Sequence, residues 1–187
     1  MSIRPVPVLS TLSRRLAGVE EAAAGLLAAA VAGLILLNVA TRTAGAALFW
    51  VDELAIYAMV WMAFLGMSIT LQRRSGVSVT ILTDALPPRL HRAAALLVDG
   101  ISLAFSLFLL WLCWCWYDPA TLASVSYSVD AFVGETFNFI YREPTQTIGI
   151  EKYWIWLIVP LTGAAMTVHA LANLLEALRS PQAVRIP

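Results

Sequence analysis

Four long apolar runs, separated by short polar segments, dominate the pattern of hydrophobic and polar positions along the chain. A helix needs about 20 apolar residues to cross the ~30 Å hydrocarbon core of a bilayer, and each run has about that length. The runs lack the alternation of a barrel strand, and backbone groups in lipid must be hydrogen-bonded within their own segment. The pattern therefore predicts four transmembrane helices, at about residues 18–41, 52–72, 93–117 and 153–176.

Composition agrees with this pattern. The chain is 60% hydrophobic and only 13% charged, which is typical of an integral membrane protein and not of a soluble domain. Arg14 and Arg15 precede the first run, so a cleaved signal peptide is the competing interpretation. The run is longer than the apolar part of most signal peptides and three more follow, which favours a retained helix. We expect an all-α integral membrane protein of one domain, residues 1–187, with the lipid bilayer around it.

The positions of arginine and lysine predict the orientation. The first and third loops contain only Arg42, Arg142 and Lys152. The other basic residues lie in the two tails and the second loop, and they are Arg4, Arg14, Arg15, Arg73, Arg74, Arg89, Arg92, Arg179 and Arg185. Because positive charge is retained on the cytoplasmic side, both termini are expected there. The second loop, residues 75–86, is expected to lie along the cytoplasmic interface. Because the net charge is formally zero, nucleic acid is not an expected partner.

The third loop, residues 118–152, is long for a connection between neighbouring helices, which is typical of an ordered or functional segment. It carries five acidic residues against two basic ones. In the stretch VDAFVGETFNFIYRE, apolar side chains fall on one helical face: Phe132, Val133, Phe137, Ile140 and Tyr141. This pattern predicts an amphipathic helix on the outer, periplasmic interface. An aromatic-rich loop packed over the helices is the alternative.

Two stripes on the first two spans are candidate partner-binding surfaces. Gly25, Ala29 and Gly33 are spaced four apart, which lets another helix approach closely, although chance spacing in an alanine-rich span is the alternative. The second span carries a stripe of residues at helical spacing: Glu53, Tyr57, Trp61, Phe64 and Ser68. The first three place an acid, a phenol and an indole in line. Such a stripe suits a protein contact better than lipid. The alternative is that Asp52 and Glu53 only complement the helix dipole at the N-terminus of the span.

Few residues in the spans could carry chemistry. Asp99 and His169 are the ionisable candidates within the membrane, and each is expected to have a structural polar partner. For Asp99, which lies about two helical turns from Arg92, the expected partner is a basic side chain at the cytoplasmic interface. Cys113 and Cys115 point to nearly opposite sides of their helix, so they cannot form a disulfide and are expected to be buried. No cofactor, metal site or catalytic residue is expected. A haem held by His91 and His169, a thiol-based redox protein, and a small independent channel lined by Asp99 are the alternatives.

Several short motifs occur together on the second span and in the loop after it. The span opens W-x-[DE]-E, continues through YAMVWMAFLGMS and ends in RRSG, and LPPRL follows. Together these motifs resemble the small membrane subunit, the DctQ type, of tripartite ATP-independent periplasmic (TRAP) transporters, and the matching positions are Trp50, Glu53, Trp61, Gly66, Arg73, Leu86 and Pro87. The resemblance covers about residues 15–117 well and the fourth span in outline. The chain departs from it in lacking a histidine between Arg74 and Thr83 and in its longer third loop.

The resemblance implies a non-enzymatic subunit of a secondary transporter in a bacterial inner membrane. Its partners would be a large multi-span membrane subunit, which holds the substrate and sodium sites, and a periplasmic solute-binding protein. The complex would take up an organic acid, for example a dicarboxylate, by sodium symport. On this view the first two spans contact the large subunit, and the acidic third loop, with Phe132 and Tyr141, lies near the docking site of the binding protein.

Overall fold

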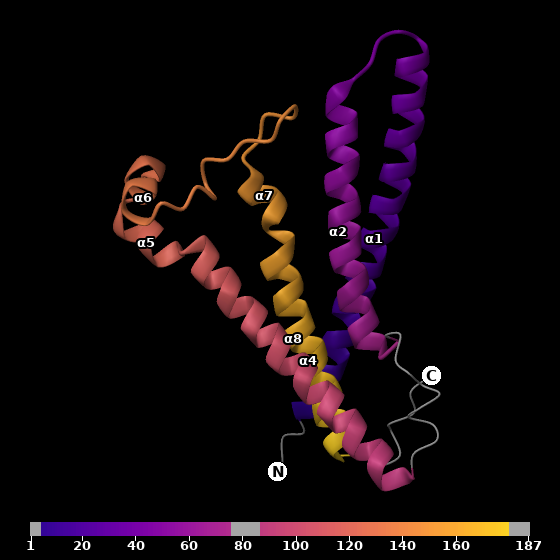
Figure 1. The fold of residues 1–187 in the computed structure, drawn as a ribbon. Helices are drawn as coiled ribbons and strands as arrows, with labels where there is room; N and C mark the ends of the chain where they lie inside the picture. The colour runs from indigo at the N-terminus through magenta and orange to yellow at the C-terminus, as the bar shows by residue number, and fades with distance from the viewer. Residues whose placement is uncertain (1–4, 76–86, 180–187) are drawn as a thin grey trace.

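The computed structural model describes residues 5–75 and 87–179, which are helical apart from short connections (Figure 1). The helices are α1 (Pro5–Thr43), α2 (Phe49–Arg73), α4 (Pro88–Tyr117), α5 (Pro119–Ser124), α6 (Val129–Thr136), α7 (Lys152–Trp156) and α8 (Ile158–Arg179). Four segments are long and apolar enough to cross a membrane: Val8–Thr43, Phe49–Arg73, Leu90–Ser124 and Lys152–Arg179. The predicted all-α fold with four transmembrane helices is confirmed. Residues 76–86, which are expected along the cytoplasmic interface, lie outside the described residues.

Prolines and left-handed residues fix several helix boundaries. Pro88 is the first residue of α4 and Pro87 precedes it in an extended conformation, as the two adjacent prolines predict. Pro160 has no N–H to donate to Trp156, and the fourth span is interrupted nearby, at Leu157, between α7 and α8. At the end of α2, Arg74 adopts a positive φ of 54°, and the following N–H bonds back to the last turn.

α8 is the central helix of the molecule. It packs against α1, α2 and α4, while α1 pairs with α2 (Figure 1). Half of the most apolar stretch of the α7–α8 span is buried within the chain, against only 6% of the corresponding stretch of α1. The single chain therefore has a core around α8 and leaves most of α1 open to lipid or to another protein.

The two ends of the molecule differ. α1 begins and α8 ends at one end of the molecule, called here the terminal end, where all four long helices meet (Figure 1). At the opposite end, the loop end, α4 leads away from α1 and α2 and continues into α5 and α6. The 43–49 connection and residues 118–151 lie at this loop end. An even number of spans places both termini on one side of a membrane.

The predicted amphipathic helix in the third loop is only partly correct. α6 covers eight residues, because Phe137 takes a left-handed conformation (φ 54°) that ends the helix. Phe132, Val133 and Ile140 are buried, but Phe137 is 80% exposed and so does not share their face. Ser128 accepts a hydrogen bond from the N–H of Ala131 and begins the helix. The segment is therefore a short helix followed by a packed aromatic loop.

Candidate functional site

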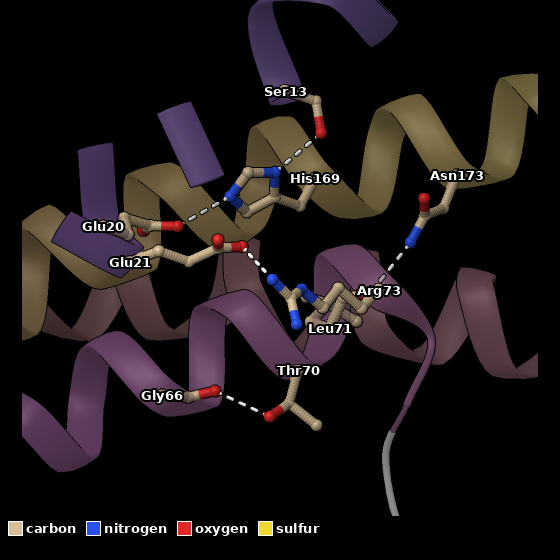
Figure 2. Close-up of polar contacts among 9 residues, drawn as sticks. All are labelled: Ser13, Glu20, Glu21, Gly66, Thr70, Leu71, Arg73, His169 and Asn173. Carbon is tan, nitrogen blue, oxygen red and sulfur yellow. Dashed lines mark hydrogen bonds and ion pairs between the residues drawn. The ribbon is translucent and has the colours of Figure 1, made fainter. Parts of the chain in front are cut away.

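A buried polar cluster joins α1 to α8 at the terminal end. The ring of His169 is fully buried, with Nδ1 2.7 Å from Oγ of Ser13 and Nε2 3.1 Å from Oε2 of Glu20 (Figure 2). A carboxylate can only accept, so Nε2 carries a proton, and a neutral ring then accepts the hydroxyl proton of Ser13 at Nδ1. The expected structural contact of His169 is thus present. Its two partners both come from α1.

The α1 side of this contact is a small polar stripe that lies ahead of the apolar run. Ser10, Ser13, Ala17 and Glu20 are all buried, at spacings of three and four residues, which place them on one face of α1. Sequence reasoning missed Glu20, which lies at the start of the first predicted span, because the candidates on that span were only the small residues Gly25, Ala29 and Gly33. The spacing itself was the available signal, since an acid in register with small residues is typical of a helix face that contacts another helix.

Two adjacent arginines tie the end of α2 to the other three long helices. Arg73 pairs with Glu21 of α1 at 2.6 Å (Figure 2). Arg74 donates to Asp99 of α4 at 2.9 Å and to the main-chain oxygen of Asn173 of α8 at 2.6 Å. These contacts hold Arg74 in its left-handed conformation, which costs about 1–2 kcal/mol for a non-glycine residue. The expected basic partner of Asp99 is therefore confirmed as Arg74.

Asn173 completes this junction from the α8 side. Its side-chain amide donates to the carbonyl oxygen of Leu71 at 2.9 Å, one of the carbonyls left open where α2 ends (Figure 2). The bond satisfies that carbonyl without water. The last turn of α2 is therefore fixed by both charge and main-chain hydrogen bonding.

At the loop end, Glu53 binds the third loop of its own chain. Its carboxylate accepts from the main-chain N–H groups of Gln146 (2.8 Å), Thr147 (2.6 Å) and Ile148 (3.2 Å), and from the hydroxyl of Thr147 at 2.5 Å. Tyr57, one turn further along α2, donates to the same carboxylate at 2.8 Å. A carboxylate that receives several N–H groups makes strong, charge-assisted hydrogen bonds. Glu53 therefore anchors the loop onto α2.

The loop is shaped to present these N–H groups. Residues 143–152 fold back on themselves: the Thr145 N–H donates to the oxygen of Ile150 at 2.8 Å, and Lys152 pairs with Glu143 at 2.5 Å. Gly149, at φ +80°, makes the turn possible. Below this turn, Nε1 of Trp61 donates to the main-chain oxygen of Ile155 at 2.8 Å. The predicted stripe on α2 thus uses its polar groups to contact the 146–155 segment.

Asp52 has a further contact besides the expected one. α2 begins at Phe49, after Leu48, so Asp52 lies in the first turn, where a negative charge complements the helix dipole as expected, although neither acid is the N-cap residue. Asp52 binds Arg42 at 2.5 Å and also accepts from the amide of Asn38, both on α1. The two adjacent acids therefore hold different neighbours, Asp52 the end of α1 and Glu53 the third loop.

Aromatic side chains hold the rest of the third loop against α4 and α7. Tyr141 lies between Phe132 and Tyr153, with ring centroids 5.3 Å from each. Its hydroxyl donates to the carbonyl oxygen of Tyr117 at 2.6 Å, and burial, with the nearby charge of Asp118 second, raises the pKa of Tyr141. Phe132 is fully buried. The two loop positions expected near a partner thus pack inside the chain, and the exposed aromatic side chains of this segment are Tyr127, Phe137 and Phe139.

The small-residue stripe on α1 contacts nothing in this chain. Gly25, Ala29 and Gly33 are all exposed, and a Cβ placed at either glycine meets no atom within 4 Å. By contrast, a Cβ at Gly163 of α8 would lie 3.2 Å from Leu110 of α4. Close helix approach within the chain therefore occurs at Gly163, and the α1 stripe stays open.

Two further candidates on α2 differ in exposure. Trp50 is 42% exposed at the loop end. Gly66 is half-buried, and its carbonyl accepts from the hydroxyl of Thr70 at 2.7 Å (Figure 2).

The structure disfavours the redox alternatives. Both ring nitrogens of His169 already have protein partners, so neither is available for a haem iron. Cys113 is buried as expected, but Cys115 is exposed, because two residues of helix turn the side chain to the opposite face; both are free thiols. Among the described residues, no group of three or more metal-ligating side chains occurs.

The fold and its contacts define a multi-pass membrane protein whose polar residues mainly fasten its own helices and loop together. The family model of the DctQ component of tripartite ATP-independent periplasmic transporters matches residues 31–180. The chain therefore belongs to the DctQ family, whose members are transporter components of the inner membrane and not enzymes.

Two curated relatives support this assignment. The chain is 22% identical over 138 residues to the "Isethionate TRAP transporter permease protein DctMQ" of Oleidesulfovibrio alaskensis, an alignment that covers 74% of this chain and 19% of the relative. It is 29% identical over 83 residues to the "C4-dicarboxylate TRAP transporter small permease protein DctQ" of Vibrio cholerae, covering 44% of this chain and 36% of the relative. The chain thus matches well under half of the length of either relative.

Proposed function

We propose that this chain is the small permease subunit of a TRAP transporter and supports a large membrane subunit in the bilayer. The observation that carries the proposal is the open surface of the helices that flank α8. Only 6% of the most apolar stretch of the first span and 17% of that of the third are buried within the chain. Lipid can cover such a surface as well as protein can, so the open surface permits a partner subunit, and the small residues exposed on α1 favour close packing with one.

The DctMQ relative supports a large partner. The matched segment is 19% of that protein's length, so most of that chain lies outside it. A small permease segment joined to a much larger part is the arrangement expected where two subunits act as one unit. In the present chain the open α1 stripe, Gly25, Ala29 and Gly33, is the surface that we assign to the large subunit, because small residues allow close helix approach.

We further propose that both termini face the cytoplasm and that the loop end faces the periplasm. The arginines at the terminal end support this orientation, since positively charged segments are retained inside. The loop anchored by Glu53 would then lie on the side from which a solute-binding protein docks, with Trp50 on the adjacent surface.

The complex is proposed to take up an organic acid by sodium symport. The two relatives are named for isethionate and C4-dicarboxylates, which are both small organic anions. The substrate and sodium sites are assigned to the large subunit, because the ionisable groups inside this chain are paired with one another.

The experiment that tests the support role is co-purification. A tagged chain extracted from its native membrane should bring down a much larger multi-span protein in stoichiometric amount. Ala29→Leu on the stripe should reduce that recovery, whereas Ala28→Leu, equally exposed but on another face of α1, should not. A stable lone monomer, or equal loss with both variants, would contradict the proposal.

The transport role is tested by reconstitution. Vesicles that contain the chain, the large subunit and the solute-binding protein should accumulate labelled organic acids only with an inward sodium gradient. The chain alone should transport none, and transport by the chain alone, altered by Asp99→Asn, would favour an independent channel.

A further inference from the structure

A polar cavity lies at the terminal end, where α1, α2 and α8 meet. Its volume is about 160 Å³. The lining is mostly polar or charged: Ser10, Ser13, Arg14, Gln72, Arg73, Arg74, Ala172, Asn173 and Glu176. At about 30 Å³ for each liquid water molecule, the space corresponds to roughly five waters, which is enough for a tetrahedral anion.

The arginines of the lining are not equally committed. Arg73 and Arg74 already bind the carboxylates of Glu21 and Asp99. Arg14 has no carboxylate partner among the described residues, and its guanidinium makes one long hydrogen bond, 3.4 Å, to the hydroxyl of Thr11. Arg14 is therefore the arginine of the lining whose guanidinium is available to bind an added anion.

Glu176 is the one acidic side chain of the lining. Together with Glu21 and Asp99, which bind Arg73 and Arg74, it balances the three guanidinium groups, so the cavity has no net charge and accepts a singly charged anion more readily than a doubly charged one. The side-chain amides of Gln72 and Asn173 in the lining can donate further hydrogen bonds to its oxygens.

We propose that this cavity binds one phosphate group, held mainly by Arg14. The planar fork of a guanidinium matches two oxygens of a phosphate, which makes arginine the usual ligand for such groups. The cavity lies where the membrane-spanning helices end, at the level of lipid headgroups, and basic pockets between transmembrane helices bind phospholipid headgroups. The phosphodiester of an anionic lipid fits the charge balance, and free phosphate is the other source of the same chemistry.

The test measures binding to the purified full chain in a phosphate-free detergent. Native mass spectrometry and thermal unfolding are followed during titration with phosphatidylglycerol, inorganic phosphate or a neutral galactolipid that contains no phosphate. Arg14→Gln is compared with Arg15→Gln, which removes the neighbouring arginine, also exposed but not part of the cavity lining. Arg14→Lys keeps the charge and removes the fork.

One phosphatidylglycerol should remain bound to the wild type and to Arg15→Gln. Arg14→Gln should bind it about tenfold more weakly, as expected when one charge-assisted hydrogen-bonding group is lost, with Arg14→Lys in between. Inorganic phosphate that binds with the same dependence on Arg14 would support the site and identify free phosphate as the source. Equal weakening by Arg14→Gln and Arg15→Gln, galactolipid binding as strong as that of phosphatidylglycerol, or binding of neither phosphate probe would overturn the proposal.

Discussion

The terminal end and the loop end use the same types of residue in different surroundings. At the terminal end the side chains of His169 and Glu20 are 0% and 6% exposed, and those of Arg74 and Asp99 are 18% and 6% exposed. At the loop end the pair Arg42 and Asp52 is 56% and 40% exposed. Burial removes the water that would otherwise replace a lost partner. The buried pairs of the terminal end and the exposed pair of the loop end should therefore respond very differently to the loss of one charge.

The largest effect is expected at the buried contact between α1 and α8. Glu20→Ala leaves Nε2 of His169 buried without a partner, and we expect a loss of about 3 kcal/mol in the free energy of unfolding. Glu20→Gln, which can still accept a hydrogen bond, should lose less. Denaturation of the purified chain in detergent micelles measures both.

Glu21→Gln is the matched control for that variant. Glu21 is the next residue along α1, and its pair with Arg73 is exposed at 41% and 56%. Its loss should cost under about 1 kcal/mol. Equal costs for Glu20→Ala and Glu21→Gln would show that burial does not separate the two contacts.

A smaller loss is expected at the junction of α2 and α4. Asp99→Asn removes the charge opposite Arg74, but Arg74 keeps its bond to the oxygen of Asn173. We expect a cost of about 2 kcal/mol, because the remaining cation stays half-buried. Asp52→Asn at the loop end serves as the exposed control and should cost under about 1 kcal/mol. A larger cost for Asp52→Asn would reverse the ranking of the two ends.

Glu53→Gln should act locally on the loop. The amide can no longer accept four charge-assisted hydrogen bonds from residues 146–148, so hydrogen exchange at these N–H groups should rise about tenfold or more. Global unfolding should change little, since the contact is partly exposed. Exchange at α8, which Glu53 does not touch, is the internal reference.

The same variant distinguishes two roles of Glu53. Weaker recovery of the solute-binding protein, with the large subunit still bound, would connect the anchored loop with docking. Unchanged recovery of both partners, despite faster exchange at residues 146–148, would restrict Glu53 to holding its own loop.

The smallest effect is expected on the open stripe of α1. Gly25→Ala meets no atom of this chain and replaces a poor helix former by the best, so the isolated chain should gain up to about 1 kcal/mol. Gly163→Ala should instead lose stability, since its Cβ would lie 3.2 Å from Leu110. Thermal unfolding of both variants compares an open surface with a packed one, and a loss for Gly25→Ala would mean that the stripe is packed.

Much of the fold could be predicted because a bilayer constrains the chain so strongly. The four spans follow from run length alone, and Pro87, Pro88 and Pro160 mark a helix start and an interruption. The partner of Asp99 was predictable as a basic residue but not as Arg74, because that contact depends on how α2 meets α4.

The contacts of Glu53 and Glu20 could not be predicted in the same way. Glu53 was recognised as part of a stripe, but its binding groups are main-chain N–H groups more than 90 residues away, which leave no trace in side-chain pattern. Glu20 lies at the start of the first predicted span, and only the packing of α1 on α8 makes it buried.

The sequence by itself determined the number of spans, the helical class, the family, and the bias of arginine toward one end. These depend on properties that each segment carries alone: length, hydropathy and charge. Only the tertiary structure decided which polar residues are buried, which loop Glu53 anchors, and that a cavity opens beside Arg14. Those features depend on the approach of helices distant in sequence, because burial and hydrogen bonding are properties of pairs of segments and not of either one.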